Sequence, residues 1–430
     1  MFDLLIRGAT LPDGRTGQDV AVRAGRIAQI APQIEAEARA VIDAGGNLLI
    51  PPFVDAHFHM DATLSLGLPR MNMSGTLLEG IALWGELRPT LTEDAVVERA
   101  LRYCDLAVSK GLLAVRSHVD VSDPALVTVR ALLEVQKRVA PYLDLQLVAF
   151  PQDGFYRCAA AQDALTRALD MGVEVVGGIP HFERTMEEGR ASVEALCRLA
   201  ADRGLRVDMH CDETDDPQSR HVETLAAQTV RFGLEGRVAG SHLTSMHSMD
   251  NYYVSKLLPL MAEAQMAAIP NPLINIMLQG RHDTYPKRRG LTRIPELLAA
   301  GVPVALGQDC VLDPWYAMGS GDMLDVAHMA VHCTQMGAGA DKRTLLDAVT
   351  EVPARILGLE DYGLAEGCWA DMVLLHAQDA AEAIRLRPAR LKVIRRGVVI
   401  SETQPDQSRL HIDGRPDVVV PASYAPNAAT

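Results

Sequence analysis

Between residues 50 and 307, short apolar runs alternate with longer segments, some of which have a helical pattern. The runs that we expect to form strands are 50–58, 112–118, 145–150, 173–178, 207–210, 238–241, 267–269 and 302–307. Helical patterns between them include 187–202 and 293–300. Eight strands that alternate with helices are typical of a (β/α)8 TIM barrel, which is an α/β fold.

Both ends of the chain have a β-rich pattern that differs from the centre. Apolar runs at 3–6 and 20–30 precede the barrel pattern, and runs at 371–375 and 391–400 follow it. We expect these runs to form one small β-sandwich that is built from both chain ends.

These patterns divide the chain into two expected domains. The small β-domain takes residues 1–50 and 366–430, and the barrel takes residues 51–365. Within the small domain, the Pro- and Ala-rich tail at 416–430 is expected to be a loose surface segment.

Composition excludes several classes of function. A net charge of -14 does not fit a nucleic-acid-binding protein, which needs a basic surface. We find no apolar run that is long enough to span a membrane, and no signal-peptide pattern at the N-terminus. The 7 cysteines are scattered, which is typical of reduced thiols in a cytosolic protein. We therefore expect a cytoplasmic protein that binds neither nucleic acid nor membrane. We also expect a homo-oligomer, although composition does not bear on that expectation.

The first barrel strand ends in His57-Phe58-His59. Side chains two apart in a strand point to the same side, so these two imidazoles can converge on one metal ion. In a barrel of this kind the active site lies at the carboxyl ends of the strands. His210 ends the fifth strand, His242 follows the sixth, and Asp309 follows the eighth.

Three imidazoles and a carboxylate at such strand ends predict a site for one metal ion, and these ligand types suit Zn²⁺ or Fe²⁺. Glu213 lies three residues after His210. From there it can reach a metal-bound water without binding the metal, and it can pass a proton to a substrate. We expect His242 to orient the water or to stabilise developing charge.

Longer blocks extend this pattern over nearly the whole chain. They are Ile50-Pro51-Pro52-Phe53-Val54, Ser74-Gly75-Thr76-Leu77, His118-Val119-Asp120-Val121-Ser122-Asp123, Val148-Ala149-Phe150-Pro151-Gln152, Gly178-Ile179-Pro180-His181-Phe182-Glu183, His210-Cys211-Asp212-Glu213, Asn271-Pro272-Leu273, Leu278-Gln279-Gly280-Arg281, Asp283-Thr284-Tyr285-Pro286-Lys287-Arg288-Arg289-Gly290 and Asp313-Pro314-Trp315-Tyr316. In this order, the blocks resemble the amidohydrolase superfamily and, within it, the bacterial cytosine deaminases.

The resemblance implies a ligand set for one Zn²⁺ or Fe²⁺, namely His57, His59, His210 and Asp309. It also implies that Asp309 takes a proton from the attacking water with the help of His242. Glu213 would deliver a proton to the ring nitrogen beside the scissile C–N bond, so that ammonia leaves.

The resemblance also implies a substrate. Gln152 would bind the amide edge of a pyrimidine, and Phe150 and Trp315 would wall the flat base. The expected reaction is hydrolytic deamination of a free pyrimidine base, cytosine or 5-methylcytosine, to uracil or thymine.

The chain departs from the cytosine deaminase pattern at Gly307-Gln308-Asp309-Cys310. The corresponding segment in those enzymes resembles Gly-His-Asp-Asp. Cys310 therefore replaces a carboxylate beside the substrate ring. A thiol is smaller than a carboxylate and is usually uncharged. Our hypothesis is that Cys310 opens space for a substituent on C5, so that 5-methylcytosine is at least as good a substrate as cytosine.

Other functions remain open on the sequence alone. The fourth strand carries no lysine of the kind that bridges two metals in relatives, which favours one metal over a dihydroorotase-like or hydantoinase-like site. An aminohydrolase of another amino-substituted ring is an alternative, with isocytosine, isoguanine or an s-triazine such as an N-alkylammelide as substrate. A non-catalytic barrel scaffold is another, although such a protein would be expected to lose metal ligands.

Overall fold

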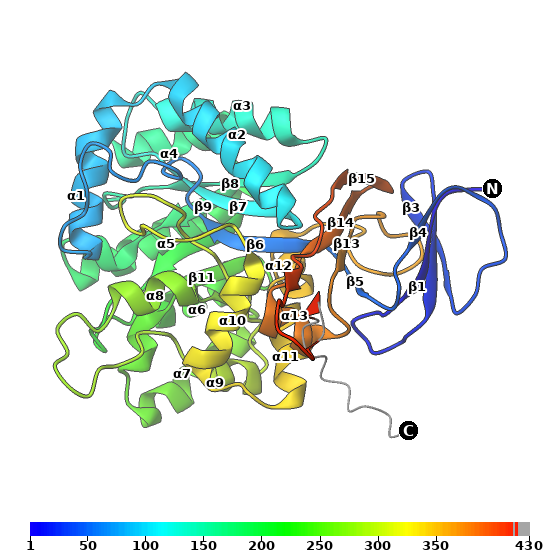
Figure 1. Ribbon diagram of the computed structural model, residues 1–430. Coiled ribbons are helices and arrows are strands. Elements are labelled where there is room, and N and C mark those ends of the chain that lie inside the picture. Colours follow the sequence, from blue (N-terminus) through cyan, green and yellow to red (C-terminus); the bar gives the residue numbers. More distant parts are fainter. Residues whose placement is uncertain (416–417, 420–430) are drawn as a thin grey trace.

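In the computed structural model, which describes residues 1–415 and 418–419, a barrel of parallel strands lies beside two smaller sheets (Figure 1). Each barrel strand pairs with its neighbour in sequence, in the order β6 to β12. These strands are β6 (Phe53–Phe58), β7 (Leu112–Asp120), β8 (Asp144–Phe150), β9 (Val175–Gly178), β10 (Arg206–Cys211), β11 (Val238–His242) and β12 (Ala267–Ile269).

The eighth predicted strand, 302–307, is an irregular segment that nevertheless completes the barrel. Val304 bridges to Ala268 of β12, and Asp309 bridges to Phe58 of β6. The backbone N–H of Asp309 donates to the His57 carbonyl at 2.8 Å, and that of His59 donates to the Asp309 carbonyl at 2.9 Å. The barrel is therefore nearly closed, and Asp309 is fixed beside the end of β6.

A close approach explains why this segment contains a glycine. A Cβ atom on Gly307 would lie 2.3 Å from Oδ1 of Asn271 and 2.7 Å from Cβ of His57. Such distances are far below normal van der Waals contact, so a larger residue would push the segment away from β6.

Helices cover the outside of the barrel (Figure 1). They are α1 (Leu77–Leu87), α2 (Glu93–Ser109), α3 (Val127–Val139), α4 (Ala161–Asp170), α5 (Met186–Arg203), α6 (His221–Arg231), α7 (Asn251–Glu263), α8 (Pro272–Leu278), α9 (Ile294–Ala299), α10 (Met323–Thr334), α11 (Gly339–Asp347), α12 (Glu351–Leu357) and α13 (Ala380–Leu386). Short 3-10 turns lie at Arg88–Thr90, Pro180–Phe182 and Thr244–His247. Among residues 1–415 and 418–419, no helix combines the length and the apolar character needed to cross a membrane.

Helix α5, predicted at 187–202, shows how local sequence sets these elements. Thr185 caps its first turn by accepting a hydrogen bond from the Glu188 backbone N–H at 3.1 Å. Gly204 ends it with a positive φ of 68°, which glycine adopts without strain. The second predicted helix, 293–300, corresponds to α9.

The chain ends form two four-stranded sheets, which run in the orders β3-β2-β1-β4 and β15-β14-β13-β5. Their strands are β1 (Phe2–Ala9), β2 (Gln18–Arg23), β3 (Arg26–Ala31), β4 (Ala38–Asp43), β5 (Leu48–Ile50), β13 (Met372–Leu375), β14 (Arg390–Arg395) and β15 (Val398–Ser401). Leu4, Ile6 and Val22 of the first sheet share one apolar core with Leu49, Met372 and Ile394 of the second. The predicted β-sandwich from both chain ends is thereby confirmed.

The predicted first strand, 50–58, is divided in the structure by Pro51 and Pro52. Ile50 pairs with Val373 in the small sandwich, whereas Phe53 pairs with Leu112 in the barrel. Proline has no backbone N–H to donate to a sheet, so a single continuous strand would lose hydrogen bonds here. The chain therefore passes from one sheet to the other within two residues.

The predicted loose tail at 416–430 lies outside the described residues, except for β17 (Val418–Val419). That strand pairs with β16 (Ser408–Arg409).

Candidate metal centre and active site

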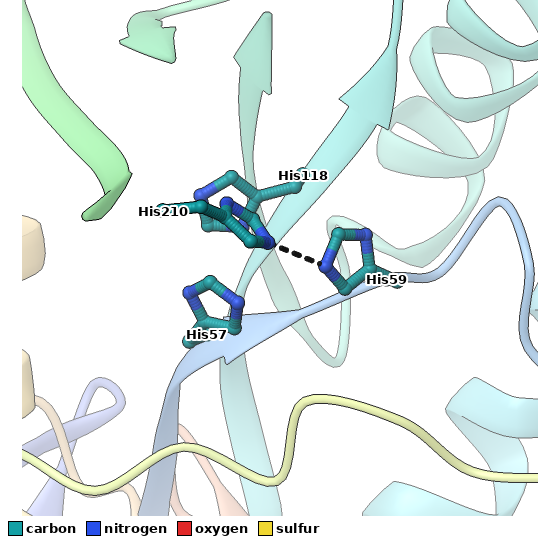
Figure 2. Close-up of side chains that lie close together, drawn as sticks. All are labelled: His57, His59, His118 and His210. Carbon is teal, nitrogen blue, oxygen red and sulfur yellow. Dashed lines mark hydrogen bonds between the residues drawn. The ribbon is translucent and has the colours of Figure 1, made fainter. Parts of the chain in front are cut away.

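Four buried imidazoles point toward one another near the carboxyl ends of β6, β7 and β10 (Figure 2). His57 lies in β6 and His59 just after it, while His118 and His210 lie in β7 and β10. The Nε2 atoms of His59 and His210 are 2.9 Å apart. The ring centroids of His57 and His118 are 4.2 Å apart.

Asp309 joins this cluster from the segment that closes the barrel. Its Oδ1 atom lies 3.4 Å from Nε2 of His57 and 3.4 Å from Nε2 of His59. The structure therefore brings together all four residues of the predicted ligand set. Two overlapping sets of side chains could each hold a metal ion, because the ligand atoms within each set lie within 4.8 Å of one another. The first set is His57, His59, His118 and His210, and the second is His57, His210, His242 and Asp309.

These residues fit a divalent metal ion. Both ring nitrogens of His57 and Nδ1 of His210 are buried and have no hydrogen-bond partner within the described chain. Leaving such atoms unpartnered is costly, and a bound cation would satisfy them. Burial lowers the pKa of His57, His59 and His210 well below the usual value, so the imidazoles are neutral, which is the form that binds metal.

Glu213 and His242 lie beside the cluster. Oε1 of Glu213 is 3.5 Å from Nδ1 of His242, and Oδ2 of Asp309 is 3.9 Å from the same nitrogen. Burial, together with the Asp309 carboxylate, raises the pKa of Glu213 well above its usual value. Burial lowers the pKa of His242 to about 3. Burial therefore disfavours the charged form of both side chains.

Backbone strain is concentrated at the same place. Asp212, His242 and Asp309 have φ values of 53°, 68° and 69°, in the left-handed region that non-glycine residues rarely adopt. Two of these residues carry side chains of the cluster itself. Strain of this kind is typical of sites where function fixes the geometry.

A cavity of about 450 Å³ opens in front of the cluster, and its wall contains most of the predicted substrate residues. Gln152, Glu213, Cys310 and Trp315 all line it, together with His59, His210, His242 and Asp309. The Trp315 ring centroid is 6.0 Å from that of His59. The cavity has room for a flat heterocycle between these side chains.

Phe150 has a different place from the one that we expected. It is buried and stacks on the ring of His210, with centroids 4.0 Å apart and planes inclined by 18°. The structure thus puts Phe150 behind a candidate ligand, not in the wall of the cavity.

Sequence reasoning missed a buried network below the metal cluster. Asp208 of β10 accepts hydrogen bonds from Arg116 at 3.0 Å and from Ser241 at 2.7 Å, and its Oδ1 lies 3.7 Å from Nε2 of His118. His118 ended a predicted strand, so its position was a usable signal. Arg116 and Asp208 lie inside predicted strands, where nothing in the sequence indicates that they pair.

Two asparagines also escaped notice, although one begins the Asn271-Pro272-Leu273 block. Asn271 and Asn275 are fully buried after β12, and the Nδ2 atom of each lies within 3.3 Å of Nδ1 of His242. Both carboxamides therefore contact the ring of His242.

The fold and this donor set are those of a metal-dependent hydrolase barrel. The chain belongs to the amidohydrolase family, whose model matches residues 40–405. Its structure is similar to that of a 5-methylcytosine deaminase from Klebsiella pneumoniae liganded with 5-fluorocytosine. The TM-score is 0.92 and the identity 42%, over 94% of this chain and 99% of that chain.

Two curated relatives are similar to this chain over most of its length. A pterin deaminase from Rhizobium rhizogenes is 31% identical over 404 residues, which cover 93% of this chain and 91% of the relative. An N-isopropylammelide isopropyl amidohydrolase from Pseudomonas sp. (strain ADP) is 29% identical over 410 residues, which cover 93% and 97%.

Proposed function

We propose that this protein is a metal-dependent aminohydrolase of a free pyrimidine base, with 5-methylcytosine and cytosine as substrates. The products are thymine or uracil and ammonia. The observation that carries the proposal is the position of Glu213, whose pKa is raised by burial, beside the His–Asp cluster, in a cavity that Gln152 and Trp315 also line. Similarity to the Klebsiella 5-methylcytosine deaminase over nearly the whole chain supports the substrate class.

In this proposal His57, His59, His210 and Asp309 hold one Zn²⁺ or Fe²⁺. When bound, such an ion lowers the pKa of a water molecule and so supplies a nucleophile at neutral pH. The absence of a lysine from β9 supports one ion per site.

The side chains then move protons. Asp309 takes the proton that the attacking water loses, and His242 assists, since its Nδ1 lies 3.9 Å from Oδ2 of Asp309. Glu213 keeps its proton for the ring nitrogen next to the scissile C–N bond, since burial disfavours its ionised form. The proton taken from the water then passes to the amino group, and the hydroxyl proton of the tetrahedral carbon returns to Glu213 as the C=O bond forms, so that the amino group leaves as ammonia.

Two other residues position the base, and a third orients a proposed metal ligand. Gln152 offers a carboxamide that matches the donor and acceptor edge of a pyrimidine amide. Trp315 covers a ring face. Phe150 acts indirectly in this scheme, because it holds the plane of His210 by stacking.

Cys310 sets the preference among pyrimidines in this proposal. It is buried in the cavity wall, with Sγ 3.7 Å from Oδ1 of Asp309. Burial, with Asp309 and Asp313 nearby, raises the pKa of the thiol well above its usual value, so it is uncharged. An uncharged, polarisable group accepts a methyl substituent more readily than a carboxylate does.

An ammonia-release panel tests the proposal. Purified metal-loaded protein is assayed with cytosine, 5-methylcytosine, isocytosine and a creatinine-like compound. Release from 5-methylcytosine and cytosine is expected. Absence of release from both, in protein with full metal content, would contradict the proposed function.

A second candidate is an aminohydrolase of a larger or different ring. Similarity to a pterin deaminase and to an N-isopropylammelide isopropyl amidohydrolase supports it, as does the volume of the cavity. A pterin and an N-alkylammelide in the same panel separate the two candidates. The expected cytoplasmic location and homo-oligomeric state stay predictions.

A further inference from the structure

A second cavity, of about 340 Å³, lies at the opposite end of the barrel from the metal cluster. Val238 and Ala267, the first residues of β11 and β12, line this cavity, whereas His242 is the last residue of β11. Helix α12 adds a wall through Arg355 and Ile356. The proposed function makes no use of this cavity, although its volume is that of a site for a small molecule.

The lining of this cavity is positively charged. Arg116, Arg237 and Arg355 all contribute to it, and we call it the arginine pocket. Among the described residues, no carboxylate lines it. The whole chain carries a net charge of -14, but charges more than about 8 Å away are largely screened at physiological salt. The pocket can therefore attract an anion locally in an acidic protein.

A fourth arginine stands just behind this lining. The guanidinium of Arg206 lies against Gly358 at the end of α12, where a Cβ atom would be 2.3 Å from its Nη2 atom. Its Nη1 atom is 3.5 Å from the carbonyl oxygen of Gly236, which lines the pocket. Burial lowers the pKa of Arg206, and the positive charges of Arg116 and Arg237 lower it further. The arginines therefore repel one another, and an anion bound among them would relieve that repulsion.

Only one of the four guanidinium groups has an ion-pair partner within the described chain. Arg116 pairs with Asp208 at 3.0 Å. Arg237 donates to the carbonyl oxygen of Gly233 at 2.8 Å, which is a neutral partner. Arg355 is exposed, and its side chain makes neither a hydrogen bond nor an ion pair with the described residues.

The acid nearest in influence to Arg355 is already paired elsewhere. Burial raises the pKa of Asp347, and the positive charges of Arg343 and Arg355 oppose that rise. Asp347 forms its ion pair with Arg343, at 2.7 Å. Three guanidinium groups, those of Arg206, Arg237 and Arg355, are thus left without a paired carboxylate in the part of the chain that the structure describes.

A phosphate group suits this excess of charge. A phosphate monoester carries about −1.5 to −2 charges at pH 7, whereas a carboxylate carries a single one. The planar guanidinium also matches the spacing of phosphate oxygens. We propose that the arginine pocket binds the phosphate group of a small molecule, and that Arg237 and Arg355 contact it. Arg116 adds positive charge from its buried position beside Asp208.

Isothermal titration calorimetry of the metal-loaded protein, in a buffer without phosphate, tests this proposal. Inorganic phosphate and ribose 5-phosphate are the probes, and ribose is the uncharged comparator. We expect each probe to bind at about one site per chain with a Kd below about 1 mM, and ribose not to bind. Tighter binding of ribose 5-phosphate would identify a phosphate ester as the ligand, and tighter binding of inorganic phosphate would identify the free ion.

Variants locate the bound group. Arg237→Gln and Arg355→Gln each remove one charge from the pocket and should weaken binding by about tenfold or more. Arg355→Lys keeps the charge and should lose less. Arg102→Gln is the matched control, because Arg102 is an exposed arginine of α2 that does not line the pocket. It should bind both probes with native affinity.

Failure of both probes to reach half-saturation by about 1 mM would overturn the proposal. An equal loss of affinity in Arg102→Gln and Arg355→Gln would do so too, because binding would then follow the charge of the whole chain. Native affinity in both Arg237→Gln and Arg355→Gln would place the ion elsewhere, for example at the metal cluster, and would contradict it as well. Ammonia release plays no part in these measurements, so a failure of the proposed function would leave the pocket's role standing.

Discussion

Phe150 lies face to face with His210, with ring centroids 4.0 Å apart and an angle of 18° between the planes. Both side chains are buried near the carboxyl ends of their strands, β8 and β10, which both pair with β9. Because His210 is a proposed metal ligand, the phenyl ring restricts the direction in which its nitrogens point. Groups that orient a ligand in this way contribute to metal affinity.

Phe150→Leu is expected to weaken metal binding about tenfold. The fold should survive, since this near volume-conserving change costs about 1 kcal/mol. Competition with a chromophoric chelator measures the affinity. Phe155→Leu is the control, because Phe155 contacts Tyr156 and none of the proposed ligands. Equal metal affinity in the native protein and in Phe150→Leu would show that the stack has no such role.

Glu213→Gln removes the proton that the site keeps for the leaving group. The change preserves shape, so metal content should stay at the native level while kcat falls by about 10² to 10⁴. Ammonia release and elemental analysis on the same samples measure both quantities. Asp216→Asn, an exposed change in the same loop, should behave like the native protein. A Glu213→Gln variant with native kcat would exclude Glu213 as the proton donor.

Removal of the metal should abolish activity and lower the thermal midpoint. The midpoint falls because a ligand at about 100 times its Kd stabilises the folded state by about 2.7 kcal/mol. Elemental analysis should give about one Zn²⁺ or Fe²⁺ per chain. Re-addition of either ion to the stripped protein should restore turnover. If protein expressed with added metal contains well under one ion per chain, the non-catalytic scaffold becomes the better account.

Arg116 and Asp208 form a buried ion pair inside the barrel, with 1% and 0% of the side chains exposed. Arg116→Met should lower the free energy of unfolding by about 3–5 kcal/mol, because it leaves a buried carboxylate without its counter-charge. Asp208→Asn in the same chain should recover part of that loss. Urea unfolding of the single and double variants measures both. If the losses in free energy of unfolding from the two single variants simply add in the double variant, the two side chains do not depend on each other.

Much of this architecture could be predicted from residues that act locally. The apolar runs follow from strand periodicity, and the His57-x-His59 pair follows from alternation within one strand. Residues after strand ends were predictable too, because a parallel barrel collects those ends on one face. Asp309 and His210 entered the predicted site for this reason, and the structure brings them together.

The remaining features depend on contacts between distant segments. The backbone N–H of Asn271 donates to the carboxamide oxygen of Asn275 and so orients that side chain. Asp208 forms its ion pair with Arg116, which lies on another strand. Neither contact is indicated by a characteristic spacing of residues in the sequence. The family resemblance implied that Phe150 faces the substrate, but packing decides whether a ring faces a cavity or a ligand, and periodicity does not specify that packing.

We propose that Cys310 fits this site to pyrimidines with a methyl group on C5. The most direct measurement is kcat/KM for 5-methylcytosine and for cytosine, in the native protein and in Cys310→Asp. We predict that the native protein uses 5-methylcytosine at least as well as cytosine, and that Cys310→Asp shifts the ratio toward cytosine by about tenfold, as expected for one changed pocket contact. A native protein that strongly prefers cytosine, with a ratio that Cys310→Asp leaves unchanged, would contradict this account.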